Sequence, residues 1–173
     1  MSLPDISDDQ LTTLTSNAIS SVFETMLGSE VAFQKSCDYS GMKAPFPDLG
    51  GEEKKMIFVG SVGFVGNVNG LVYLYMKSCF AERAAGKITG LEGDELDFEI
   101  VSDVCGELTN VFAGGFKNAL ADMGYNSVLT IPTVLSGDEL YISTLGVVKH
   151  LRHNYLSNGE EIVADLVLAE TKD

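Results

Sequence analysis

Two polar side chains one helical turn apart stand beside glycines in the segment SDVCGELTNVFAGGFKNAL, residues 102–120. The pair is Glu107 and Asn110, and the glycines lie at 106, 114 and 115. A glycine inside a helix costs about 0.5–1 kcal/mol relative to alanine, and one reason to accept that cost is the close approach of another surface. A carboxylate and an amide on a helix without bulky neighbours could therefore project into a partner's pocket. Two alternatives stay open: the pair is merely solvated, or the glycines serve helix contacts within the chain.

Helical geometry separates a buried face from a polar stripe in this segment, which we predict to be a helix over 97–123. At 100° per residue from Ile100, the apolar side chains fall in an arc from about 20° to 160°. They are Val101, Val104, Cys105, Leu108, Val111, Phe112, Phe116 and Ala119. Asp103, Glu107, Asn110 and Gly114 fall between about 280° and 340° and form one stripe at the edge of that arc.

The three glycines take different places around this helix. Gly106 lies just outside the stripe, near 240°, so Gly106 and Gly114 flank the pair of polar side chains. Gly115 falls near 60°, and we expect it to pack against a sheet. We therefore predict Asp103, Gly106 and Gly114 as partner contacts beside Glu107 and Asn110.

The rest of the sequence predicts the elements that would position this helix. Apolar residues at three- and four-residue steps predict a second long helix over 7–27, with Gly28 as its stop. A short helix is expected over 80–88, capped by Ser78, and loops are expected over 44–55 and 91–97.

Strands are predicted over 30–40, 56–66, 71–78, 126–137, 138–156 and 160–170. Asn69-Gly70 is a hairpin signal, and Pro132 suggests an edge strand or a bulge. Helices followed by runs of strands indicate an α+β fold, with an antiparallel or mixed β-sheet and the two long helices packed on one face.

We expect residues 1–173 to form a single domain, in which 7–90 and 97–173 could be two half-repeats. The segment AISSVF at 18–23 can be laid over ELTNVF at 107–112. Ala18 then takes the place of Glu107, and Ser21 takes the place of Asn110. The alternative is that any two amphipathic helices can be overlaid in this way.

Composition excludes several classes of function. A formal net charge of −14 argues against a nucleic acid or an anionic membrane surface as partner, because both favour basic patches. The most apolar windows, MIFVGSVGFVG and LVYLYM, are too short for membrane insertion, and the acidic start MSLPDISDDQ does not resemble a signal peptide. Three widely spaced cysteines argue against a disulfide scaffold and favour a reducing, cytoplasmic location.

Other residues with chemical potential have simpler explanations. His150 and His153 would point to opposite faces of a strand, so a shared metal ion is not expected. Cys105 maps to the buried arc, where a free cysteine acts as a small apolar residue. Asp103 could assist the site, but an aspartate near a helix start also suits the helix dipole. We predict no metal site and no cofactor.

The combined motifs resemble the CheC/CheX family of chemotaxis phosphatases. The family pattern is Asp or Ser, three residues, Glu, two residues, Asn and a later Pro, and Asp103, Glu107, Asn110 and Pro132 fit it. ELTNVFAGGFK is similar to the family's Glu-Leu-x-Asn-x-x-x-Gly helix, and IPTVLSG to its Pro-Thr-Val-x-x-Gly strand. NAISSVFETMLG resembles the first helix of CheX-type members. CheC-type members carry the motif on both long helices, whereas this chain has it once, which is the CheX-like arrangement.

The resemblance implies hydrolysis of the aspartyl phosphate on a phosphorylated, CheY-like response-regulator receiver domain, which carries its own Mg²⁺. It implies that Asn110 orients the attacking water, and that Glu107 pairs with the receiver's active-site lysine. Positioning a water is the main requirement of in-line phosphoryl transfer, and a carboxylate facing a lysine docks through a charge-assisted hydrogen bond.

Two other roles stay open at this point. The chain could be a non-catalytic adaptor that binds a receiver or a motor component, although intact Glu107 and Asn110 favour catalysis. CheX-like members also form homodimers through β-sheet contacts, which is compatible with either function.

Overall fold

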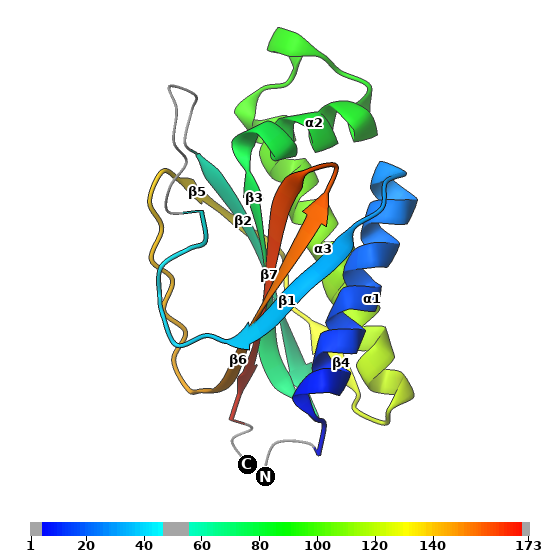
Figure 1. Cartoon of the computed structure of the whole chain (residues 1–173), viewed down its shortest axis with the longest axis vertical. Coiled ribbons are helices and arrows are strands. Elements are labelled where there is room, and N and C mark those ends of the chain that lie inside the picture. The colour runs from blue at the N-terminus through cyan, green and yellow to red at the C-terminus, as the bar shows by residue number, and fades with distance from the viewer. Residues whose placement is uncertain (1–4, 47–55, 171–173) are drawn as a thin grey trace.

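Three layers make up the fold, with helices on one side of a β-sheet and two loop segments on the other (Figure 1). The computed structural model describes residues 5–46 and 56–170. The elements are α1 (Asp8–Leu27), β1 (Ala32–Asp38), β2 (Ile57–Gly66), β3 (Asn69–Lys77), α2 (Ser78–Thr89), a 3₁₀ turn (Gly93–Glu95), α3 (Phe98–Asp122), β4 (Ser127–Leu129), β5 (Thr133–Gly137), β6 (Val147–Ser157) and β7 (Glu160–Ala169). The α+β class is confirmed. The part 47–55 of the loop expected over 44–55 lies outside the described residues.

Local signals place the ends of both long helices. Ser7 caps α1 in a capping box with Gln10, and Gly28 ends it in the left-handed conformation at φ 53°. Asp97 caps α3 by accepting a hydrogen bond from the Ile100 N–H. The prediction that Ser78 caps the short helix is wrong, because Lys77 holds that position and Ser78 is the first helical residue.

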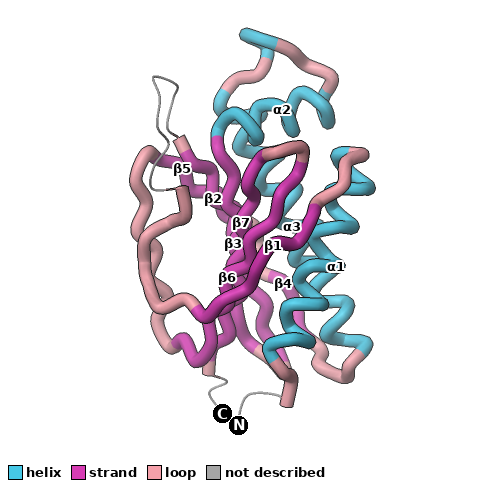
Figure 2. The backbone as a smooth tube through the Cα atoms, viewed as in Figure 1, coloured by secondary structure: helices cyan, strands magenta, loops and turns pink. Residues whose placement is uncertain are grey.

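The sheet has seven antiparallel strands in the order β1-β6-β7-β3-β2-β4, with β5 also paired to β2. The hairpins β2–β3 and β6–β7 form its centre, and β1 and β4–β5 form its edges (Figure 2). Each edge element pairs with the hairpin of the other half of the chain. Two half-repeats over 7–90 and 97–173 would produce this order, and the repeat stays a prediction.

Two predicted strands are interrupted. The segment 126–137 forms β4 and β5 with a break that contains Pro132, so the prediction of an edge position is confirmed. The segment 138–156 is a strand only from Val147 onward. Residues 138–146 instead cross the outer face of the sheet, where Leu140 and Ile142 pack against apolar side chains. Apolar and polar residues alternate in 138–146 as they would in a strand, but this segment is a loop that covers the sheet.

The two faces of the sheet carry separate apolar clusters. The larger cluster joins α1, α2 and α3 to one face, and includes Phe23, Phe64, Phe112 and Phe116. The smaller cluster lies on the opposite face, beneath Ala44, Phe46 and the 138–146 segment. Among the described residues, no helix combines the length and the apolar character that crossing a bilayer requires.

Candidate active site

The predicted stripe lies on the outer side of α3, away from the sheet. Asp103 and Glu107 are exposed, and Asn110 and Gly114 are half-buried. No described atom would come within 4 Å of a Cβ added at Gly114, so the helix surface is open there. The helix brings these four residues to one accessible line, as its periodicity predicts.

The opposite side of α3 fixes the orientation of this stripe. Phe112 and Phe116 are fully buried against the sheet, and the ring of Phe116 lies 5.7 Å from that of Phe64 on β2. Gly60 on β2 brings the helix close to the strand, because a Cβ at Gly60 would lie only 2.7 Å from the Cβ of Thr109. The stripe therefore belongs to a helix that cannot roll without losing this fit.

The remaining glycines of α3 face its own neighbours. Gly106 is buried, and a Cβ there would lie 3.4 Å from the Val134 side chain on β5. It cannot contact a partner directly, which corrects the expectation for this residue. Gly115 was expected to pack against the sheet, but a Cβ there would meet Ala18 of α1 at 3.4 Å. Contact within the chain thus explains two glycines, and only Gly114 fits an approach from outside.

The side chains of Glu107 and Asn110 are free to act on a partner. Neither forms a hydrogen bond or ion pair with any residue in 5–46 or 56–170. The Glu107 carboxylate can accept hydrogen bonds or pair with a cation, and the Asn110 amide can both donate and accept. One turn apart on a rigid helix, they offer a fixed anion and a neutral group for orienting water.

Asp103 lies too far along α3 to serve its N-terminus. Asp97 caps the helix and Glu99 occupies its first turn, whereas Asp103 is the sixth helical residue. The dipole effect fades within the first turn, so this explanation of Asp103 is weakened. Asp103 is exposed on the same stripe as Glu107, so its role as a partner contact stays a prediction.

Pro132 lies in the strand break beside the middle of α3. Near its start, α3 meets β5 where Gly106 faces Val134. Further along, the Phe116 ring packs at a tilt against Phe64, whose register partner is Leu129 of β4. Helix and strands therefore run in opposite directions, and both Asn110 and Pro132 fall between these two contacts. In this antiparallel arrangement, Pro132 is level with the part of α3 that carries Asn110.

The other candidates occupy structural positions. Burial raises the pKa of Cys105 to about 12, which keeps the thiol protonated and unreactive. His153 is buried against α1, where its Nε2 lies 3.3 Å from Thr12 Oγ1, and His150 lies on the other face of the sheet. The described part of the chain holds no cluster of three His, Cys, Asp or Glu that could bind a metal ion.

Sequence reasoning missed a polar cluster around Asp165, which lies on the face of the sheet opposite the helices. This fully buried carboxylate accepts hydrogen bonds from Arg152 and Tyr75, and His150 Nε2 lies 2.9 Å from it. Burial alone would raise the pKa of Asp165, but hydrogen bonds from Arg152 and His150 hold it below its usual value. Charged residues within two apolar strands, at Arg152 and at Asp165, were the signal that could have revealed it.

Comparison with known proteins assigns the chain to a family. The model of the family described as chemotaxis phosphatase CheX matches residues 58–152, more than half of the chain. The CheY-P phosphatase CheX of Thermotoga maritima is 30% identical over 137 residues, which are 77% of this chain and 81% of that protein.

Solved structures agree in fold. The chemotaxis protein CheX of Desulfovibrio desulfuricans superposes with a TM-score of 0.75 at 20% identity, over 92% of this chain and 99% of that one. CheX in a CheX–CheY–BeF₃–Mg²⁺ complex from Borrelia burgdorferi gives a TM-score of 0.66 at 25% identity, over 91% and 97%. With the matching family model and the Thermotoga relative, these similarities show that the chain belongs to the CheX family of chemotaxis phosphatases.

Proposed function

We propose that the chain hydrolyses the aspartyl phosphate of a phosphorylated CheY-like receiver domain, with the outer stripe of α3 inserted into the receiver's active site. The observation that carries the proposal is the pair Glu107 and Asn110, unpaired within the described chain beside the open surface at Gly114. The Thermotoga relative is named a CheY-P phosphatase. The Borrelia complex joins CheX to CheY with BeF₃, whose shape and charge resemble a phosphoryl group, and with Mg²⁺.

The reaction needs a water in line with the bond that breaks. In our proposal the Asn110 amide holds this water, whose oxygen attacks phosphorus while the acyl phosphate P–O bond breaks. The receiver's aspartate leaves as a carboxylate, and inorganic phosphate is released. A neutral amide suits this task because it adds no charge beside the phosphoryl oxygens. Mg²⁺ held by the receiver would stabilise charge on those oxygens.

Glu107 would fix the register of the helix. We propose that its carboxylate pairs with the receiver's active-site lysine, which sets the distance from Asn110 to the phosphoryl group. Asp103, one turn nearer the start of α3, would extend the same acidic edge. Gly114 would let the receiver's backbone approach the helix. Gly106 would support the stripe from beneath, through its contact with β5.

The test is dephosphorylation of a phosphorylated CheY-like receiver from the same organism. We expect Asn110→Ala to lower kcat by about 10²–10³-fold, the effect of removing one transition-state hydrogen bond. Glu107→Ala should raise KM by roughly 10- to 100-fold, because it removes a charge-assisted hydrogen bond. Asn17→Ala is the matched control, since Asn17 is an exposed asparagine on the neighbouring helix α1 and is not part of the stripe.

A receiver that binds but keeps its phosphate would contradict catalysis and favour the adaptor role instead. An active Asn110→Ala variant would instead place the chemistry elsewhere on the molecule.

We also propose a homodimer and a cytoplasmic location. Large apolar side chains are exposed on β5 and on the segment that follows it: Leu135, Tyr141 and Leu145. Such a patch is typical of a protein interface, and sedimentation velocity would show whether the protein dimerises.

The three free cysteines suit a reducing compartment, and cell fractionation would test the location.

A further inference from the structure

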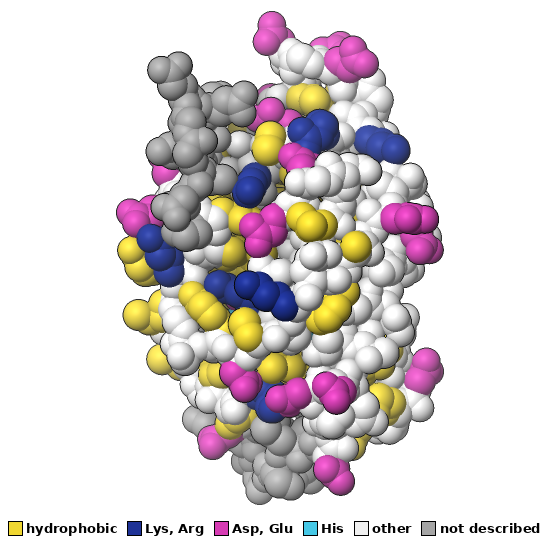
Figure 3. Space-filling model, viewed as in Figure 1, with side chains coloured by type: hydrophobic (Ala, Val, Ile, Leu, Met, Phe, Trp, Pro, Cys, Tyr) yellow, Lys and Arg dark blue, Asp and Glu magenta, His cyan; other side chains and the backbone are white. Residues whose placement is uncertain are grey.

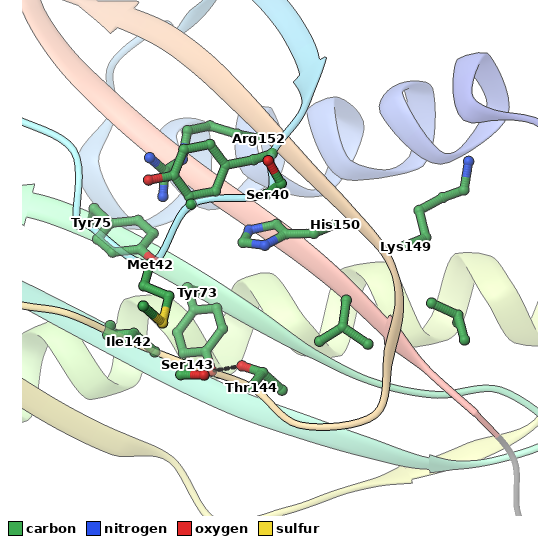
Figure 4. Close-up of a pocket in the computed structure, with 14 residues that line it drawn as sticks. Ser40, Met42, Tyr73, Tyr75, Ile142, Ser143, Thr144, Lys149, His150 and Arg152 are labelled. Carbon is green, nitrogen blue, oxygen red and sulfur yellow. Dashed lines mark hydrogen bonds between the residues drawn. The ribbon is translucent and has the colours of Figure 1, made fainter.

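A cavity of about 460 Å³ opens on the face of the sheet opposite α3. Its floor comes from β3 and β6, and its walls come from residues 39–42 and 142–144 (Figure 4). Volumes of this size are usual for small-molecule sites. In the space-filling view, apolar and basic side chains intermix over the middle of the molecule (Figure 3). The cavity is separated from the Glu107–Asn110 stripe by the full thickness of the sheet.

The guanidinium group of Arg152 lies on the floor of the cavity and is held in place by its neighbours. Arg152 donates two hydrogen bonds of 2.7 Å to Asp165, and its guanidinium carbon lies 3.6 Å from the centre of the Tyr39 ring. These contacts hold the guanidinium plane in one orientation. Its third nitrogen, Nη1, has only a long contact of 3.5 Å with the Lys43 carbonyl oxygen. Donor capacity is therefore left over in a side chain that is 10% exposed.

His150 adds a second nitrogen-bearing group to the floor. Its Nε2 faces Asp165, and its ring packs edge-on against Tyr39 at 5.1 Å. Asp165 itself is fully buried beneath these residues. Of the described residues that line the cavity, none is acidic, although the chain has 25 acidic and 11 basic residues. The charged side chains that line the cavity are therefore basic, although basic residues are the minority in this chain.

The walls combine apolar side chains with hydroxyl groups. Met42, Ile142 and the ring of Tyr73 lie near one another in Figure 4, and the Tyr73 hydroxyl lies 3.0 Å from Thr144 Oγ1. Lys149 contributes little charge here, because its ammonium group points away from the cavity and pairs with Asp8.

We propose that this cavity binds a small organic anion with a flat apolar body. The acid group would lie against Arg152 and His150, and the apolar body would lie between Tyr73, Met42 and Ile142. Asp165 holds the two basic side chains in place without facing the ligand. Two features of the cavity define the ligand class: a guanidinium with unused donor capacity, and apolar side chains that a free inorganic ion would leave uncovered.

Matched pairs of probes test the charge requirement. Indole-3-acetate and benzoate would be titrated calorimetrically, with indole-3-acetamide and benzamide as neutral counterparts. We expect one-to-one binding of at least one acid with a Kd below about 1 mM, and binding of its amide weaker by about tenfold or more. Three of the six tyrosines line the cavity and the chain has no tryptophan, so benzoate can also be followed by tyrosine emission.

A pair of variants locates the binding. Ser143→Trp places a large ring at the rim and should abolish binding. Ile131→Trp is the control, because Ile131 is 86% exposed and does not line the cavity. Thermal unfolding would show that both variants fold. The proposal fails if acid and amide bind equally, if neither acid binds below about 10 mM, or if Ser143→Trp binds as the wild type does.

Discussion

Gly114 gives a test in which stability and activity should move in opposite directions. A Cβ at this position meets no described atom within 4 Å, so Gly114→Ala adds a methyl group without a clash. Replacing glycine by alanine inside a helix gains about 0.5–1 kcal/mol. For a chain of this length, 1 kcal/mol raises Tm by roughly 2–4 °C. We therefore expect Tm to rise by about 1–4 °C in a thermal melt.

The same methyl group should obstruct the docked receiver. Overpacking a close contact costs about 1–3 kcal/mol, which corresponds to a loss of roughly 5- to 150-fold in kcat/KM, and Gly114→Leu should lose more. The assay is dephosphorylation of the receiver at concentrations well below KM. Asn17→Ala is the control, since it also gains helix propensity at an exposed position, but on α1 instead of the stripe. A Gly114→Ala protein that is stabilised and fully active would refute the close approach.

Two further predictions concern the fold that supports the site. Gly60→Ala should destabilise the protein by about 1–3 kcal/mol, because the new Cβ collides with Thr109 beneath the stripe; a urea titration with unchanged stability would contradict the close contact of α3 with β2. Burial lowers the pKa of His153 from 6.5 to about 4, so as pH falls the unfolded chain takes up the proton first. The free energy of unfolding should therefore be highest above pH 6.5 and should fall by roughly 3 kcal/mol between pH 6.5 and 4. His153→Gln should flatten this part of the pH profile, and an equal slope in both proteins would show that another group is responsible.

Much of the fold followed from local patterns. The apolar periodicity and the caps at Ser7, Gly28 and Asp97 define the two long helices, since these interactions lie within a few residues. The segment 138–146 shows the limit. Its alternation predicts a strand, but whether Leu140 and Ile142 join the sheet or cover it depends on residues far away in the chain.

The candidate site also has a part that local geometry predicts and a part that depends on contacts with other elements. The turn of a helix places Asp103, Glu107, Asn110 and Gly114 on one line without any tertiary information. The roles of Gly106 and Gly115 could not be obtained like this, because they depend on Val134 and Ala18, which belong to other elements.

The two halves of the chain exchange their edge strands, and this couples the folding of one half to that of the other. The β2–β3 hairpin pairs with β4 and β5 from the second half, and β1 from the first half pairs with β6. Neither half can complete its own sheet, so the chain should unfold as one cooperative unit, and its many distant pairings should slow folding. In the proposed overlay of the two halves, α1 has the buried Ala18 at the place of Glu107 in α3, and Ala18 packs against α3 at Gly115.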